Sequence, residues 1–305
     1  MSTIGIDIGG SKALAVRLDG GAVADQRHTA TRRGPLFDTA VEVIRGVWAD
    51  DVEAVGVGIA GLVQWPEGVF AWGPHVDGTD VPLRALLEEE LEVPVAVDND
   101  ANVAAFGERV GGAARGFDDF LLVTLGTGIG GAIMVDGSVY RGESFAGEWG
   151  HIKHDPSGLL CDCGKRGCWE TVASGPALVR LAREVMGLNP EGSLAGRFGS
   201  LPITGEDVTA AADGGDEVAR GLVAEVGSEL GRGLANLIAI FDPELVVVGG
   251  GLGSVGEALL GPARRIAAET LHGGNHRLLP PILVAGAGPR AGAIGAAYLA
   301  SSIRS

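Results

Sequence analysis

Short apolar runs alternate with amphipathic stretches along the whole chain. Apolar runs bounded by glycine-rich turns are typical of buried strands, whereas apolar residues that recur at every third or fourth position indicate helices. The pattern predicts strands at about 4–8, 13–18, 23–28, 54–59, 95–97, 120–125, 132–135, 245–248 and 282–285. It predicts helices at about 37–48, 82–90, 101–110, 175–186, 216–241, 255–271 and 291–301. This alternation predicts an α/β protein.

One motif occurs twice. In residues 5–20 a strand enters a glycine turn, a second strand leaves it, and an Asp-Gly turn follows; residues 123–137 repeat this order with the same glycine spacing. Two copies of one β-hairpin predict two related domains, although a chance match of two glycine-rich hairpins is the alternative. We expect a small domain at 1–111 on which the closing helix within 291–305 packs back. The segment 111–116 is expected to be a linker or hinge, followed by a larger domain at 112–290.

Charge and composition exclude several classes of function. The 305 residues carry a formal net charge of −16, so the chain is not suited to neutralising nucleic-acid phosphates. The start has no basic segment before an apolar core, so no signal peptide is expected, and no apolar run has membrane-spanning length. We therefore expect a cytoplasmic protein with no nucleic-acid or membrane partner.

The three cysteines of the chain, Cys161, Cys163 and Cys168, lie in one short stretch, ten residues after His151. An odd number of thiols in one loop does not suit a disulfide framework, whereas three thiolates and an imidazole suit tetrahedral zinc. Because four protein ligands leave no open position, the predicted zinc is structural. The alternative is a chance cluster of small buried side chains.

Glycine-rich turns predict a phosphate site, but not a Rossmann or P-loop site. The G-x-G-x-x-G match at 126–131 is followed by a strand instead of a helix, and the match at 251–256 lacks a carboxylate after the next strand. Hairpin turns can still bind phosphate, because glycine lets backbone amides form a concave nest. Asp7, at the end of the first strand, is suited to holding Mg²⁺ through water. The predicted nucleotide-binding residues are Asp7, Gly9, Gly10, Ser11, Lys12, Gly126, Thr127, Gly128 and Gly130.

Four segments together resemble the ROK family (repressor, open reading frame, kinase). They are residues 7–12, 125–131, 148–151 and 161–170, and the resemblance extends from residue 4 to near 298. Among the members, the chain is most similar to bacterial ATP-dependent glucokinases in 167–180. Ser11 stands where threonine is commoner, and Trp149 occupies a variable position. The resemblance implies an actin-like ATPase (ribonuclease-H-like) fold of two domains, with a sugar in the interdomain cleft.

The resemblance also implies roles for individual residues. Asn99 and Asp100 match an Asn-Asp pair in which the Asp is the general base, and Gly61 matches a turn that lines the sugar. Further sugar ligands are implied at Glu148, His151 and Glu170, with His151 shared with zinc, and an adenosine-binding turn at Gly249, Gly250 and Gly251. A carboxylate can accept the proton that a hydroxyl loses as it attacks a phosphate.

Simpler roles remain open for several of these polar residues. Asp100 could cap the helix that follows it. Glu148 and Glu170 could be solvated, and Asp98, His154 and Asp162 are expected to be structural or exposed.

The function expected from these observations is ATP-dependent phosphorylation of glucose to glucose 6-phosphate, with Mg²⁺ and one structural Zn²⁺. The alternatives are a kinase for N-acetylglucosamine, N-acetylmannosamine or another hexose, and a sugar-responsive regulator without catalysis. A polyphosphate donor is disfavoured, because glucokinases that use it typically lack the cysteine cluster. We expect a homo-oligomer, either a dimer or a tetramer.

Overall fold

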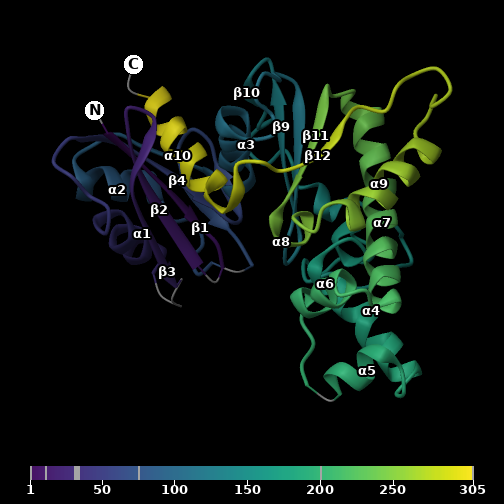
Figure 1. Ribbon diagram of the computed structural model, residues 1–305. Helices are drawn as coiled ribbons and strands as arrows, with labels where there is room; N and C mark the ends of the chain where they lie inside the picture. Colours follow the sequence, from purple (N-terminus) through teal and green to yellow (C-terminus); the bar gives the residue numbers. More distant parts are fainter. Residues whose placement is uncertain (1, 11, 31–34, 75, 200, 304–305) are drawn as a thin grey trace. The chain divides into compact units, whose positions relative to one another are not determined.

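A computed structural model describes residues 2–10, 12–30, 35–74, 76–199 and 201–303 (Figure 1). Contacts divide the chain into two compact units. The first comprises Met1–Leu122, Ala132–Gly147 and Gly286–Ser305, and the second comprises Val123–Gly131 and Glu148–Ala285. Both contain strands and helices, as the α/β prediction requires.

The first unit is built on a five-stranded sheet with the order β3-β2-β1-β4-β7. Its strands are β1 (Ser2–Ile8), β2 (Lys12–Asp19), β3 (Ala22–Ala30), β4 (Val52–Ile59) and β7 (Val95–Asn99). Its helices are α1 (Leu36–Arg45), α2 (Leu83–Leu91), α3 (Asp100–Gly111) and α10 (Ala291–Ser302), and the short strands β5 (Leu62–Gln64) and β6 (Val69–Trp72) form a separate ribbon. β1 is antiparallel to β2 and parallel to β4, which is parallel to β7.

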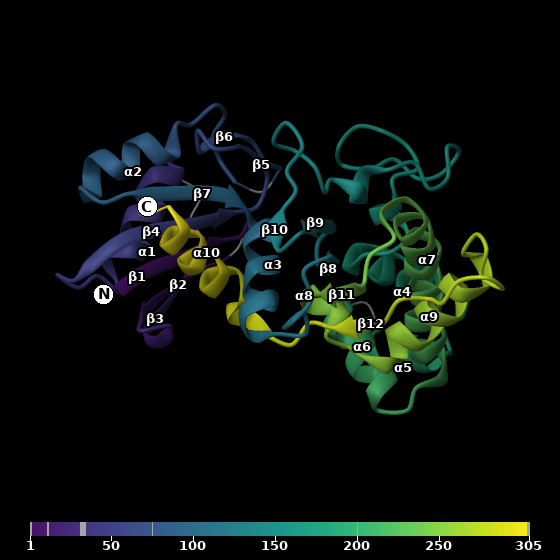
Figure 2. The ribbon, with the colours of Figure 1, turned by 90° about the horizontal axis from the view of Figure 1, so that it is seen from above.

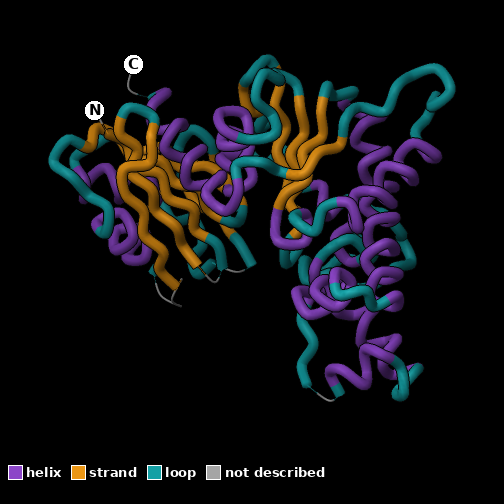
Figure 3. The backbone as a smooth tube through the Cα atoms, viewed as in Figure 1, coloured by secondary structure: helices purple, strands orange, loops and turns teal. Residues whose placement is uncertain are grey.

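The second sheet has the order β10-β9-β8-β11-β12. Its strands are β8 (Phe120–Leu125), β9 (Ile129–Val135), β10 (Ser138–Val139), β11 (Leu245–Gly249) and β12 (Ile282–Val284). Helices make up much of the second unit (Figure 3): α4 (Gly175–Leu188), α5 (Ser193–Phe198), α6 (Gly205–Asp213), α7 (Glu217–Phe241), α8 (Gly250–Gly253) and α9 (Glu257–Thr270).

The two sheets have the same topology. Numbered in chain order, the strands of each sheet are arranged 3-2-1-4-5, and in each sheet the first and second strands flank one of the repeated glycine turns. The internal repeat predicted from the hairpin motif is therefore confirmed.

The predicted strands and helices are all present, with ends that differ by a few residues. The pattern missed β5, β6, β10, α5, α6 and α8, because elements this short or this polar do not complete a recognisable period. The segment 111–116, expected as a linker or hinge, forms turns after the end of α3. Buried Glu108 accepts a hydrogen bond there from Ala113 N at 2.8 Å. Glu108 also accepts from the amides of Gly286 and Ala287, both at 2.9 Å.

The sheet of the first unit has two different faces. Alternate residues of β1, β4 and β7, such as Ile6, Val57 and Val97, pack into one hydrophobic core with α1 and α2. The residues between them are small, and this second face receives α10 and α3. Figures 1 and 2 show α10 lying across it.

Glycine allows the helices to approach this face at backbone distance. A Cβ added to Gly5 would lie 1.9 Å from Ala293 O, and one added to Gly56 would lie 1.8 Å from Ala296 O. On the helix side, a Cβ at Gly295 of α10 would lie 1.7 Å from Val103 O of α3. These contacts leave no room for side chains, so the packing of α10 fixes the positions of β1, β4 and α3.

Among the residues that the structure describes, no helix combines the length and the apolar character needed to cross a membrane.

Two glycines of α3, one helical turn apart, test the close contact with α10. A Cβ at Gly107 would lie 2.1 Å from Ala291 O, whereas a Cβ at Gly111 would meet nothing within 4 Å. We expect Gly107→Ala to destabilise the protein by about 1–3 kcal/mol, as overpacking does. Gly111→Ala should be neutral or stabilising by up to about 1 kcal/mol. Urea unfolding measures both, and equal effects would contradict the packing.

Candidate active site and metal centre

Asn99 and Asp100 lie where β7 passes into α3. Asn99 is the N-cap, since its Oδ1 accepts hydrogen bonds from Ala101 N at 2.8 Å and Asn102 N at 3.3 Å. Its Nδ2 donates to Gly61 O at 3.0 Å, so the cap is also tied to the turn between β4 and β5. The alternative in which Asp100 caps the helix is therefore wrong: Asp100 is the first helical residue.

Asp7 and Asp100 are neighbouring carboxyls of the first unit. Burial and repulsion from Asp100 raise the pKa of Asp7 to about 7, against a lowering by the charge of Lys12. Burial also raises the pKa of Asp100, although backbone hydrogen bonds at Ala101 and at Asp100 itself lower it in part. Asp7 lies close to α10, because a Cβ at Gly292 would be 2.4 Å from its Oδ2. Two carboxylates held in this way favour a cation or a proton between them.

Each predicted phosphate turn is closed by a backbone hydrogen bond. Gly9 N donates to Lys12 O at 3.0 Å in the first turn, and Gly126 N donates to Gly128 O at 3.0 Å in the second. Gly10, Gly126 and Thr127 are exposed. Ser11 lies outside the described residues. These turns thus present accessible groups, including a hydroxyl at Thr127, to an anion.

The turn after β11 requires glycine. Gly250 has φ +81°, and a Cβ there would lie 2.3 Å from Leu125 O at the end of β8. Gly249 caps α8, and a Cβ at Gly251 would meet nothing within 4 Å. The backbone after β11 is therefore open on one side and packed against β8 on the other.

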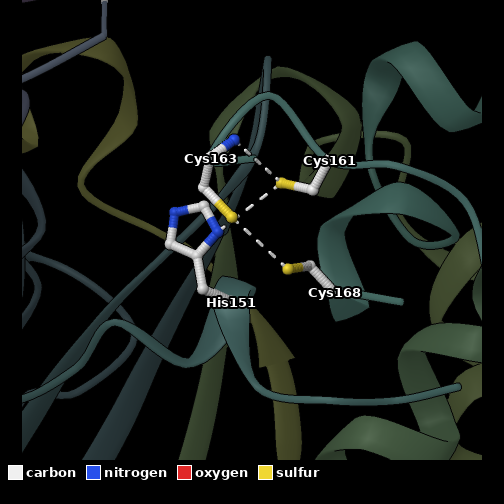
Figure 4. Close-up of side chains that lie close together, drawn as sticks. All are labelled: His151, Cys161, Cys163 and Cys168. Atoms are coloured by element: carbon white, nitrogen blue, oxygen red, sulfur yellow. Dashed lines mark hydrogen bonds between the residues drawn. The ribbon is translucent and has the colours of Figure 1, made fainter. Parts of the chain in front are cut away.

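The three cysteines and His151 form one cluster (Figure 4). Their ligand atoms, one from each residue, all lie within 4.8 Å of one another. Cys163 Sγ is 3.6 Å from Cys168 Sγ, and Cys161 Sγ is 3.7 Å from His151 Nδ1. Sulfur atoms this far apart are not a disulfide, whose S–S bond is about 2 Å long.

The cluster fits zinc. A tetrahedron with Zn–S bonds of about 2.3 Å has edges of about 3.8 Å, close to the separations observed. The ligand set of three cysteines and one histidine is also a common structural zinc set. These four residues would therefore hold a structural zinc ion, which would cross-link segments that have little regular structure.

Glu170 connects the cluster to the second phosphate turn. Its Oε1 lies 2.9 Å from Cys161 Sγ and 3.3 Å from His151 Nδ1, and its Oε2 accepts a hydrogen bond from Ile129 N at 3.4 Å. A Cβ at Gly128 would lie 2.4 Å from the same Oε2. The solvated alternative for Glu170 is therefore wrong. Glu148, which begins the same segment, is exposed.

Some residues at the site had no signal in the sequence. Lys153 Nζ donates to Cys168 Sγ at 3.2 Å, which places a positive charge beside the thiol cluster. Trp169 Nε1 donates to Glu229 O at 3.0 Å, and His154 Nε2 lies 2.7 Å from Glu229 Oε2, so the cysteine loop is fastened to α7. His154 is thus structural, as expected.

Asp98 is also structural, as expected, but its partner was not foreseen. It is buried and forms an ion pair with Arg141 at 2.7 Å. Asp98 is 43 residues from Arg141 in sequence, and spacing alone does not reveal such a pair.

Comparison with known proteins identifies relatives over nearly the full length. The model of the ROK family matches residues 3–303. A glucokinase from Streptomyces coelicolor is 38% identical over 98% of this chain and 97% of its own. The xylose repressor of Bacillus subtilis is 29% identical over 92% of this chain and 73% of its own length.

A solved structure shows the same architecture. A ROK family glucokinase from Streptomyces griseus, in complex with glucose and AMPPNP, has a TM-score of 0.90 and 40% identity, and covers 99% of this chain and 100% of its own. This similarity confirms the prediction of the actin-like ATPase fold.

The zinc site can be tested by metal analysis. We expect the purified protein to contain about one zinc per chain, and Cys163→Ser to lose it, because a tetrahedral site needs all four ligands. Its melting temperature should fall by roughly 5 °C or more, since each kcal/mol shifts it by about 2–4 °C in a large domain. Asp162→Asn, in the same loop but outside the cluster, is the control. The assignment would be contradicted if the wild-type protein contained no zinc and Cys163→Ser had the same melting temperature as the wild type.

The raised pKa of Asp7 predicts how stability depends on pH. Between pH 4 and 7 the folded protein holds a proton on Asp7 that the unfolded chain releases, so this group lowers stability as pH rises. In the absence of Mg²⁺ and nucleotide, Asp7→Asn should raise the unfolding free energy at pH 8 by as much as ~4 kcal/mol, and hardly at all at pH 4.

The control for this effect is Glu42→Gln, which removes an exposed charge of α1 in the same unit. Its effect on unfolding free energy should be small at both pH values. A gain for Asp7→Asn that is the same at pH 4 and pH 8 would show that Asp7 does not carry the raised pKa.

Proposed function

The chain belongs to the ROK family, and on that premise we propose that it is a glucokinase that transfers the γ-phosphoryl group of ATP to the 6-hydroxyl of glucose. Relatives that are 38% and 40% identical over nearly the whole chain are glucokinases, and one of them was solved with glucose and AMPPNP. The observation that carries the proposal at the level of chemistry is the position of Asp100, a half-buried carboxyl at the first turn of α3 that lies close enough to Asp7 to raise its pKa.

Asp100 is proposed as the general base. As the 6-oxygen of glucose forms its bond to the γ-phosphorus, the bond from that phosphorus to the β–γ bridging oxygen breaks, and ADP leaves. The hydroxyl proton passes to the Asp100 carboxylate. Burial raises the pKa of this carboxyl, which makes it a better proton acceptor near neutral pH. Asn99 fixes the start of α3, so the base is held in place by helix capping.

The residues proposed to bind the sugar are Gly61, Asn99, Asp100, Glu148, His151 and Glu170. In the first unit Gly61 and Asn99 are already joined by a hydrogen bond. In the second, His151 belongs to the cysteine cluster, Glu170 contacts it, and Glu148 is an exposed residue whose backbone O accepts a hydrogen bond from His151 N. Because His151 presents Nδ1 to the cluster, its Nε2 is left to bind a sugar hydroxyl. Carboxylates, amides and imidazole match the donors and acceptors of a hexose.

ATP is proposed to bind at the glycine turns. Lys12 supplies the charge, Thr127 a hydroxyl, and the turns their amides. Mg²⁺, when bound, would neutralise developing charge on the phosphates, and Asp7 would hold it through water. The residues proposed to bind ATP and its Mg²⁺ are Asp7, Gly9, Gly10, Ser11, Lys12, Gly126, Thr127, Gly128, Gly130, Gly249, Gly250 and Gly251.

A reduced cysteine cluster favours a reducing compartment, so we propose a cytoplasmic location. We also propose a homo-oligomer, whose size cross-linking or light scattering would give.

The alternative activities are separated by one kinetic experiment. ATP turnover is coupled to ADP detection with glucose, mannose, fructose, N-acetylglucosamine and N-acetylmannosamine, and compared as kcat/KM. We expect glucose to be preferred. A higher kcat/KM for an N-acetylated sugar would assign the enzyme to another hexose. No turnover with any sugar would favour a regulator, a class to which the related xylose repressor belongs.

The role of the base has its own test. We expect Asp100→Ala to lower kcat by about 10²–10⁴-fold, since this is the usual contribution of a general base, with glucose affinity changed little. Steady-state kinetics and calorimetry with glucose measure the two effects. Asp38→Ala, an exposed carboxylate of α1, is the control. Near wild-type kcat for Asp100→Ala would rule out the assignment.

A further inference from the structure

A buried ion pair between Asp98 and Arg141 lies beside the Asn99-Asp100 pair, because Asp98 directly precedes Asn99 on β7. Asp98 ends the buried part of β7, and its side chain is 2% exposed. Its Oδ2 accepts two hydrogen bonds from Arg141, from Nε at 2.9 Å and from Nη2 at 2.7 Å. Both donors of one edge of the guanidinium are thus used on Asp98, a geometry that lysine does not reproduce.

The other oxygen of Asp98 accepts hydrogen bonds from residues on both sides of Asp100. Oδ1 accepts one hydrogen bond from Asn99 N at 2.8 Å and another from Asn102 Nδ2 at 2.8 Å. Asn99 precedes Asp100 and Asn102 follows it by two residues, so the carboxylate fastens the first turn of α3 on both sides of Asp100. Its four hydrogen bonds therefore link Arg141 to the backbone that carries the proposed base.

Arg141 is itself held in place. Its Nη1 donates to Val139 O at 3.2 Å, and its guanidinium carbon lies 4.0 Å from the centre of the Trp65 ring. Ser144 Oγ accepts a hydrogen bond from Trp65 N at 3.1 Å and donates to Trp65 O at 3.4 Å. Only 12% of the Arg141 side chain is exposed. A side chain fixed on every side can orient its partner.

We propose that Arg141 is a positioning residue for Asp100 and acts through Asp98. By occupying Oδ2, Arg141 leaves Oδ1 to hold Asn99 and Asn102, and so sets the direction of the base. The proposal rests on the role of Asp100 proposed above.

The position of a catalytic group strongly affects the rate of the chemical step, and a misplacement of about 1 Å can cost on the order of 100-fold. Loss of Arg141 should therefore act on kcat. A buried ion pair that served stability alone would change the melting temperature and leave the kcat of the folded molecules unchanged.

The experiment is a double-mutant cycle between Arg141 and Asp100. It uses Arg141→Met, Asp100→Ala and the double variant, with radiolabelled ATP to measure slow turnover, and melting temperatures to confirm folding. We expect Arg141→Met to lower kcat on the order of 10–100-fold while KM for ATP changes less than about threefold. In the Asp100→Ala background the same substitution should change kcat less than about twofold, because there is no base left to position.

Arg141→Lys extends the test, because it keeps the charge in case Arg141→Met folds poorly. It should restore kcat only in part, since lysine lacks the planar fork and the stacking on Trp65. The control is Arg109→Met. Arg109 lies in the last turn of α3 and forms an ion pair with Asp118. The side chains of Arg109 and Asp118 are 38% and 63% exposed, so the kcat of this variant should remain near the wild-type value.

Two results would overturn the proposal. One is a wild-type kcat for both Arg141 variants, whatever their melting temperatures. The other is an equal loss of kcat in the presence and absence of Asp100. The single variant Asp100→Ala reports separately on the base: if it is fully active, the proposed role of Asp100 fails, and the positioning role fails with it.

Discussion

The contact of α10 with the glycine-lined face of the first sheet is the constraint on which the first unit depends. Backbone atoms of α10 approach Gly5 and Gly56 so closely that neither position tolerates a Cβ. This face ends at Asp7 on β1 and at Asp98 on β7, beside the start of α3. The packing of α10 beside Asp7 therefore also removes water from the carboxyl of Asp7, and burial is the main cause of the raised pKa of Asp7 and of Asp100.

In the second unit, the loop that carries the cysteines depends on a different kind of interaction. The loop from His151 to Cys168 contains little regular structure beyond two isolated bridges, at Lys153 with Cys168 and at Leu160 with Arg166. Zinc bound by the four ligands of this loop would cross-link it. The same loop brings Glu170 against the second glycine turn. The metal would thus have a structural role, and the loop that holds it would also fix the position of Glu170.

The sequence predicted features that depend on local pattern. The repeated hairpin predicted an internal repeat, and the two sheets share one topology. The three closely spaced cysteines predicted a zinc site, and their sulfur atoms cluster with His151 at distances that fit zinc. It did not predict partners that only the fold brings together. Arg141 lies 43 residues from Asp98, and no periodicity connects them. Likewise, Asn99 and Asp100 are both good N-caps, and only the backbone geometry decides that Asn99 takes this role, with Asp100 as the first residue of α3.

The central claim is that Asp100 receives the proton of the glucose 6-hydroxyl. A crystal structure of the protein with glucose and a non-hydrolysable ATP analogue tests it most directly. The account predicts that the 6-oxygen of glucose lies within hydrogen-bond distance, about 2.6–3.2 Å, of a carboxylate oxygen of Asp100. A complex in which the 6-oxygen is bound to another group, with Asp100 out of reach, would contradict it.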